Sequence, residues 1–254
     1  MGSLNWITSK DKMIINGISS DRVGLYVDTP YMPPMPELNA NTFNTGSEES
    51  TIINELQFQD ITITVTGFLF ESRYNPYELY RYLISAKKLS FSTNPRIYYR
   101  VKHVYGVSPQ YAGMQKNRLE MQFVCSPFRY AVTNQKMAYT NDEPETEKTV
   151  SIYNQCPIFI NPVYKATDFL SGATGIEITV NSEKVTFTLP ATPPDTFVID
   201  IDNQTVYGEN SGSKVNVFSN VSGKWWNFFL NPGYTDIAIK NFGSLEIIKN
   251  ERWI

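Results

Sequence analysis

Histidine, cysteine and charge are all scarce in this 254-residue chain, and each scarcity narrows what the protein can do. The single histidine, His103, has no second histidine and no cysteine near it in the sequence, which leaves a zinc site or a nucleophile–base pair without partners. Because His103 is in phase with Tyr99 and Val101, we expect a hydrogen-bonded, half-buried strand histidine. The two cysteines, Cys125 and Cys156, are too few for a disulfide framework and lie beside apolar or proline residues, so we expect buried thiols rather than a mutual bridge.

Charged residues make up only 19% of the chain, and the formal net charge is −3. Proteins that hold nucleic acid phosphates by bulk electrostatics are rich in Lys and Arg, so this composition excludes that class. The chain contains no apolar run of 18 residues, and its amino terminus lacks the apolar core of a signal peptide. We therefore expect a soluble protein that is made in a cytoplasm.

Catalytic and cofactor-binding motifs are also missing. The sequence has no nucleophile elbow, phosphate loop or dinucleotide fingerprint. Residues 200–203 (Asp-Ile-Asp-Asn) resemble the start of a calcium loop, but Gln204, Thr205 and Ser211 occupy the later ligand positions and break the match. We predict no catalytic residue, no metal site and no cofactor, and hence no enzyme activity.

Aromatic residues are abundant at 14%, which favours strands and large contact surfaces. Residues 61–69 alternate cleanly, with Ile61, Ile63 and Val65 predicted to face a core. Residues 97–105 alternate in the same way. The opposite faces of the two segments are polar, and we expect them at a subunit interface or along a channel; the residues in question are Thr62, Thr64, Thr66, Tyr98 and Arg100.

One helix is predicted after this first strand. Asn75 is a good N-cap and Pro76 suits the first helical position, with Glu78 at capping-box spacing. The spacing of apolar residues predicts a single buried stripe that packs on a sheet. Its members are Tyr77, Tyr80 and Ile84, widened by Leu79, Leu83 and Ala86.

Two segments break the periodicity. Four prolines within residues 30–36 exclude a central strand and leave two interpretations, a rigid surface loop or an arm that grips a neighbouring subunit. Residues 134–149 have no apolar residue after Tyr139 and carry a cluster of acidic residues around Pro144. This segment is the best candidate linker, and we place a domain boundary between residues 140 and 141.

Beyond the linker, short strands recur about every ten residues, as in a β-sandwich. The last thirty residues carry three alternating runs, around Phe228, Ile237 and Leu245, separated by turn signals at 231–233 and 241–243. The chain ends on a large apolar pair, Trp253-Ile254, which suggests a final strand that is packed down. Trp225 and Trp226 are adjacent, so at most one of them faces a given side of a strand, and a core position is expected.

The order of these segments resembles the distal tail protein (Dit) family of long non-contractile-tailed phages that infect Gram-positive bacteria. The resemblance spans nearly the whole chain and rests on order rather than on one diagnostic motif. It is carried by Met13–Gly17, the alternating strand to Gly67, the helix from Asn75 with its Lys87-Lys88 exit, Asn154, Pro157, the hairpin at Ile176, Ile199-Asp200, Trp226, the turn Asn231-Pro232-Gly233 and the Arg252-Trp253-Ile254 ending.

The resemblance implies a mainly β fold with one helix. Residues 1–140 would be a tail-tube-like domain that closes a homo-hexameric ring, and residues 141–254 a galectin-like β-sandwich. The ring would be assembled in the host cytoplasm and sit in the virion at the tail tip or baseplate, joining the tail tube protein to the tail-associated (tail fibre-like) protein. Phage DNA would pass through it without specific binding, and the outer domains would hold peripheral baseplate proteins.

Two departures from the family qualify this picture. The length leaves no room for an inserted arm or carbohydrate-binding module, and Gln155-Cys156 stands where relatives often have a glycine, which leaves the turn after Asn154 open. A lectin-like carbohydrate-binding module that contributes to host recognition remains the alternative to a structural hub, and an enzyme is a distant third.

Overall fold

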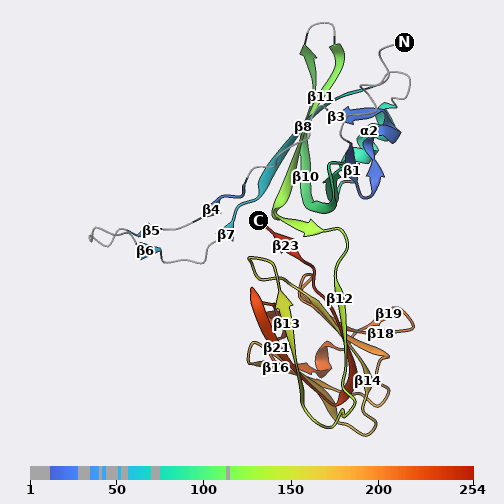
Figure 1. Cartoon of the computed structure of the whole chain (residues 1–254). Coiled ribbons are helices and arrows are strands. Elements are labelled where there is room, and N and C mark those ends of the chain that lie inside the picture. Colours follow the sequence, from blue (N-terminus) through green and yellow to red (C-terminus); the bar gives the residue numbers. More distant parts are fainter. Residues whose placement is uncertain are drawn as a thin grey trace. The chain divides into compact units, whose positions relative to one another are not determined.

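The computed structural model describes residues 12–27, 35–39, 42–43, 51–52, 57–69, 75–112 and 115–254. They belong to two compact units, one formed by Met1–Val132 with Ile254 and the other by Thr133–Trp253 (Figure 1). We call them unit 1 and unit 2 and describe each by itself. The structure confirms a mainly β chain whose described part contains one α-helix.

Unit 1 is built on one antiparallel sheet with the strand order β2-β1-β9-β10-β11-β8-β3. Its strands are β1 (Met13–Ile15), β2 (Ile18–Ser19), β3 (Leu25–Val27), β8 (Ile61–Leu69), β9 (Lys88–Phe91), β10 (Asn94–Ala112) and β11 (Gln115–Ala131). A 3₁₀ turn, η1 (Ser20–Val23), leads into β3. Two further two-stranded sheets pair β4 (Leu38–Asn39) with β7 (Gln57–Phe58) and β5 (Thr42–Phe43) with β6 (Thr51–Ile52).

Strand β8 has the faces that its sequence predicts. Ile61, Ile63 and Val65 are buried in the core of unit 1, while the threonines between them are exposed or half-buried. Burial of one face is what selects this register, because a slip by one residue would bring the threonines into the core. The rest of this core comes from β1, β3, β9, β10, β11 and the helix.

Helix α2 (Pro76–Ile84) starts as predicted, with the Asn75 side chain accepting a hydrogen bond from the Tyr77 N–H at 3.0 Å. The predicted buried stripe is wrong in part, however. Leu79 and Leu83 are buried together with Tyr82, whereas Tyr77, Tyr80 and Ile84 are exposed.

The cause is the anchoring of Tyr82. Its hydroxyl accepts a hydrogen bond from the Ile15 N–H at 3.2 Å and lies 3.2 and 3.0 Å from the Met13 and Ile18 carbonyl oxygens. A nine-residue helix can turn only one arc towards the core, and these bonds to β1 and β2 select the arc that contains Tyr82. Ala86, beyond the helix end, is buried as predicted.

The β10–β11 hairpin is irregular, and this corrects the prediction for His103. The register shifts between Val101 and His103, so His103 no longer shares the core-facing phase of Tyr99 and Val101. Its side chain is exposed and stacks on Tyr105, with ring centroids 6.0 Å apart. The alternation of residues in a sequence cannot reveal a β-bulge, because a residue is extra only relative to the partner strand.

Unit 2 is a sandwich of two antiparallel sheets. The six-stranded sheet has the order β12-β22-β14-β17-β18-β19, and the five-stranded sheet has the order β13-β21-β15-β16-β20. Their bounds are β12 Lys136–Thr140, β13 Lys148–Asn154, β14 Val163–Phe169, β15 Gly175–Val180, β16 Glu183–Thr188, β17 Thr196–Asp200, β18 Thr205–Asn210, β19 Ser213–Val215, β20 Val221–Ser222, β21 Gly233–Lys240 and β22 Phe242–Ile248. The final short strand, β23, is Arg252–Trp253, and the 3₁₀ turns η2 (Phe218–Asn220) and η3 (Trp225–Asn227) lie between β19 and β21.

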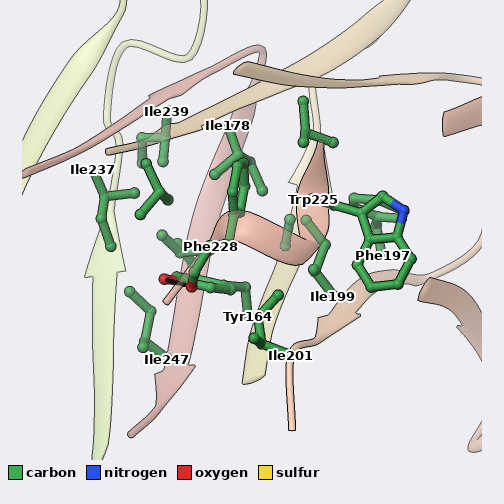
Figure 2. Close-up of a cluster of buried hydrophobic side chains, with 14 of the residues drawn as sticks. Tyr164, Ile178, Phe197, Ile199, Ile201, Trp225, Phe228, Ile237, Ile239 and Ile247 are labelled. Carbon is green, nitrogen blue, oxygen red and sulfur yellow. Dashed lines mark hydrogen bonds between the residues drawn. The ribbon is translucent and has the colours of Figure 1, made fainter. Parts of the chain in front are cut away.

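The sandwich core combines buried aliphatic side chains, chiefly Val and Ile, with a few buried aromatic rings (Figure 2). Phe187 of the five-stranded sheet stacks on Phe197 of the six-stranded sheet, with centroids 4.3 Å apart and planes at 4°. The Tyr164 hydroxyl donates to the Phe228 carbonyl oxygen at 2.8 Å, which satisfies the one polar group that this ring brings into the core. Burial raises the pKa of Tyr164 well above its ordinary value, so the hydroxyl stays a donor.

Three parts of unit 2 differ from the sequence predictions. The strand predicted around Phe228 is wrong: residues 225–227 form the turn η3, which buries Trp225 and leaves Trp226 exposed, and Leu230 makes only an isolated bridge with Ile160. Residues 136–140, which we assigned to the first domain, form β12 and pair with β22 of unit 2. The predicted linker is an ordered loop of unit 2, in which the buried Asn141 donates to the Thr146 carbonyl oxygen and accepts from the Glu143 N–H.

Most of the proline-rich segment, residues 28–34, lies outside the described residues, so the choice between loop and arm stays a prediction. The turn after Asn154 is well defined. The Asn154 side chain accepts from the Cys156 N–H and donates to the carbonyl oxygens of Ile158 and Leu230, which stabilises the turn that the sequence left open.

Candidate assembly surface

Two groups of side chains point away from the core of unit 1. The first group, which we call the outer sheet face, combines the β8 threonines with their cross-strand partners. Thr62, Thr64 and Thr66 pair with Val124, Gln122 and Glu120 of β11, and Val124 and Gln122 pair in turn with His103 and Tyr105 of β10.

The outer sheet face is polar and nearly uncharged. Thr62 and Tyr105 are exposed, and Gln122 donates to the Glu120 carboxylate at 3.4 Å. At the margin of the face, the Lys102 ammonium lies 2.7 Å from the Asp60 carboxylate, so this charge is neutralised by a neighbour. Such a face resembles the interior of an interface more than a region that binds a charged ligand.

The second group is an aromatic–cation cluster of Lys88, Tyr98, Arg100 and Tyr130. The two tyrosine rings stack with centroids 5.5 Å apart, the Lys88 ammonium lies 4.7 Å from the Tyr98 centroid, and the Arg100 guanidinium lies 4.0 Å from that of Tyr130. Both rings are buried under these cations. The cations on the tyrosine faces stabilise the cluster by the attraction of a positive charge to an aromatic ring.

The predicted site residues therefore fall into two sets. The structure brings Thr62, Thr64 and Thr66 together in one row and joins Tyr98 and Arg100 in a separate cluster. The exposed helix residues Tyr77, Tyr80 and Ile84 were not predicted as a site, because the sequence pattern assigned them to the core. The sequence did contain a sign of this exposed surface: large apolar residues cover two different arcs of one short helix, and only one arc can face the core.

The remaining reactive groups are held in inert positions. Cys125 and Cys156 are free and buried. Burial, helped by the charge of Asp60, raises the pKa of Cys125 to about 12, and burial also raises the pKa of Cys156. Thiols with raised pKa values are poor nucleophiles and poor metal ligands at neutral pH.

Residues 200–203 form a self-contained turn. The Asp200 carboxylate accepts hydrogen bonds from the Asn203 backbone N–H at 3.0 Å and from the Asn203 side-chain amide at 2.7 Å. These bonds engage both carboxylate oxygens within the turn itself. Nowhere in the described ranges do three His, Cys, Asp or Glu side chains gather closely enough to hold a metal ion.

One open pocket of about 420 Å³ lies over the acidic loop of unit 2. It is lined by Asn141, Asp142, Glu143, Thr146, Glu147, Lys148 and Thr149. This lining contains no histidine, cysteine or aromatic platform, so it lacks the groups of a nucleophilic or sugar-binding site. Of the helices that the structure describes, none has the length and apolar character needed to span a membrane.

The fold of the two units, a long-hairpin sheet with a helix and a two-sheet sandwich, is similar to the folds of solved phage tail and baseplate proteins. The SPP1 Dit protein (gp 19.1), described as a paradigm of the hub adsorption apparatus in phages that infect Gram-positive bacteria, matches with a TM-score of 0.63 at 15% identity. The match covers 96% of this chain and 99% of that one.

Two structures of the phage P2 baseplate in its activated conformation, one with calcium and one with strontium, match as well. Their TM-scores are 0.53 and 0.55 at 12% and 11% identity, and each match covers 95% of this chain and 98% of the other. No protein-family model matches the sequence, and neither does any curated protein. The resemblance to distal tail proteins is thus confirmed as a likeness of fold.

Proposed function

We propose that this protein is a structural hub of a phage tail tip, which forms a homo-hexameric ring between the tail tube protein and the tail-associated protein. The observation that carries the proposal is the likeness to SPP1 Dit over 96% of the chain, in both units and in the same order. Since unrelated functions can share a fold, the site must support the role as well. Here the outer sheet face offers a contact surface with little charge and both thiols are buried, as expected of a building element.

The outer sheet face and the aromatic–cation cluster would then lie at a subunit interface or along the central channel. A channel that conducts DNA must not retain phosphates, and binding to DNA strengthens with each phosphate that Lys or Arg neutralises. The threonine row carries no charge, and the two cations of the cluster are engaged with tyrosine rings. Unit 2 would face outward and hold the peripheral baseplate proteins.

Light scattering after size-exclusion chromatography tests the ring. Six copies of the 29.0 kDa chain give a mass of about 174 kDa for a closed ring of head-to-tail contacts. Assembly could require the neighbouring tail proteins, so the measurement is repeated with the tail tube protein and the tail-associated protein added. A mass that stays at one chain in both experiments would rule out the hub.

A second candidate, carbohydrate binding by unit 2, is favoured by one observation. Tyr153 of β13 and Tyr234 of β21 form a cross-strand pair with centroids 5.0 Å apart, and both rings are more than half exposed beside Ser151 and Asp236. Exposed aromatic rings next to hydroxyl and carboxylate groups suit a sugar ring. Calorimetry with cell-wall saccharides of Gram-positive bacteria, with Tyr234→Ala as the variant, tests this candidate, and an absence of heat with the wild type would exclude it.

A further inference from the structure

The helix of unit 1 exposes three large apolar side chains, Tyr77, Tyr80 and Ile84, which we call the helix stripe. Their exposed fractions are 86%, 53% and 77%. At about 100° per residue the three positions span roughly 60° of the helix surface, on a different arc from the buried Leu79 and Leu83. The helix is therefore apolar on two sides, and a helix of that kind normally has both sides covered.

The helix stripe is held rigidly in place. The Asn75 cap fixes the start of the helix, and the three contacts of the Tyr82 hydroxyl with β1 and β2 fix its rotation. A surface that is rigid before binding loses little conformational entropy when it is covered. Tyrosine is also one of the residues that most often supply binding energy in protein interfaces.

The chemistry of the stripe limits what can cover it. It contains no charge, and the neighbouring exposed residues of the helix, Glu78 and Arg81, carry opposite signs. Neither a phosphate backbone nor a strongly charged peptide would gain from this surface. The complementary surface must be largely uncharged and able to hydrogen-bond the two tyrosine hydroxyls.

The outer sheet face of the same chain meets these requirements. The row from Thr62 to Thr66 is about 13 Å long at the usual rise of a strand, and the helix stripe from Tyr77 to Ile84 is about 10 Å long. The strands β8, β11 and β10 together are about 10 Å wide, which is the diameter of a helix. The threonine hydroxyls and the Gln122 amide can donate hydrogen bonds to the tyrosine hydroxyls and can accept hydrogen bonds from them.

The two surfaces cannot meet within one chain. The buried sides of α2 and β8 belong to the same core, so the helix stripe and the outer sheet face both point outward from it on different elements. A chain with two different, mutually complementary surfaces forms head-to-tail contacts, and such contacts close into a ring when the rotation permits.

We propose that the helix stripe of one protomer packs on the outer sheet face of a second copy of this chain. The inference rests on the proposed ring and specifies which residues of each protomer form the contact. It assigns Tyr77, Tyr80 and Ile84, together with the threonine row, to the subunit interface. It also explains why large apolar side chains occupy exposed positions of the helix.

Two lysine variants of the full chain test the contact. Ile84→Lys places a charge in the helix stripe while keeping a good helix former near the negative end of the helix dipole, and Thr64→Lys places a charge in the threonine row. Each variant should remain at about 29 kDa by light scattering under conditions in which the wild type forms its ring. Mixed in equal amounts, the two should form a heterodimer of about 58 kDa, because each supplies the surface that the other lacks.

Ile18→Lys is the matched control, since Ile18 is another exposed isoleucine of unit 1 and, as a residue of β2, belongs to neither surface. It should form the ring as the wild type does. Rings formed by Ile84→Lys would overturn the proposal and leave the ring itself intact. Dimers formed by Thr64→Lys alone would show that the stripe packs on a second stripe instead. If Ile84→Lys forms rings but fails to bind an added tail protein, the occupant of the stripe is that protein, and the proposal is wrong.

Failure of the wild type to assemble, with or without the tail proteins, would reject the proposed function. That outcome is distinct from the failure of the inference alone, in which the wild type and both lysine variants form equal rings.

Discussion

At the scale of single residues, a few polar groups determine how unit 1 is put together. Tyr82 bonds backbone atoms of β1 and β2 and thereby sets which arc of the helix faces the core. In unit 2, Asn154 bonds the Cys156 N–H and the Leu230 carbonyl oxygen and thereby sets the path of the turn after β13. In each case one side chain hydrogen-bonds backbone groups of neighbouring segments and so holds those segments together.

Tyr82→Phe is expected to destabilise the protein by about 1–2 kcal/mol, because the buried hydrogen bonds of the Tyr82 hydroxyl with β1 and β2 would be lost. Urea unfolding of the full chain measures the loss in the transition of unit 1. Tyr80→Phe is the control, because it removes a hydroxyl from the exposed side of the same helix and should change stability by less than about 0.5 kcal/mol. Equal stabilities of the two variants would contradict the anchoring role.

Protonation of the Asp21 carboxylate should make unit 1 less stable at low pH. Burial acts to raise the pKa of Asp21, but the hydrogen bond from Lys12 and the positive charge of Lys12 outweigh it and lower the pKa below its ordinary value of 3.8. A carboxylate with a lowered folded-state pKa contributes stability above its unfolded-state pKa, and that contribution is lost as the pH falls through the folded-state value.

Asp21→Asn is accordingly expected to be less stable than the wild type at pH 7, and the difference should shrink below about pH 4. Urea unfolding at a series of pH values measures this convergence. A stability difference that is the same at pH 7 and pH 2 would mean that the ion pair with Lys12 contributes nothing.

At the scale of elements, close contacts between strands restrict which substitutions unit 2 tolerates. Gly223 has φ +104° and follows β20, and a Cβ placed there would come 2.2 Å from the Lys184 carbonyl oxygen of the neighbouring strand β16. Only glycine fits both the dihedral angle and the space.

Gly223→Ala should therefore destabilise unit 2 by about 3 kcal/mol or more, since backbone must move in addition to the strain at positive φ. Gly172→Ala is the control, because Gly172 also has a positive φ but its Cβ would meet no atom within 4 Å. Its cost should be about 1–2 kcal/mol, that of the left-handed conformation alone. Thermal unfolding compares the two, and similar midpoints would show that the strand contact can relax.

At the scale of the whole molecule, the position of the division between the units decides which fragments fold when they are expressed separately. Met137 and Tyr139 of β12 pack on the core of unit 2, and β12 covers the edge of β22. A fragment that begins at residue 149 would lose this strand. We therefore expect residues 133–254 to fold as a monomer and residues 149–254 to be less stable by several kcal/mol, the scale of losing two buried side chains.

The complementary fragment, residues 1–132, is expected to oligomerise alone, because the helix stripe and the outer sheet face both belong to unit 1. Light scattering of the separate fragments checks both expectations. A ring formed by residues 133–254 while residues 1–132 stay monomeric would reverse the roles of the two units. Limited proteolysis should not cleave first within residues 141–148, since this loop is tied down through Asn141.

Local sequence signals were sufficient for part of the fold. The alternation in residues 61–69 predicted which side of β8 is buried, and Asn75 with Pro76 predicted where the helix begins. The two cysteines were correctly expected to be buried and free. These features depend only on a residue's immediate neighbours along the chain or on its own chemistry.

Other features were decided by the tertiary structure. Periodicity states which residues share a face, but two arcs of α2 are apolar, and only the bonds of Tyr82 to β1 and β2 decide which arc is buried. His103 does not face the core because the register of β10 shifts just before it. Such a shift is defined only relative to the partner strand β11. Likewise, β12 belongs to unit 2 because its hydrogen-bond partner, β22, lies about a hundred residues later in the chain. The sequence by itself thus determined the class of fold and the burial of single strands, whereas the surfaces left for assembly depended on contacts between distant segments, which no local pattern encodes.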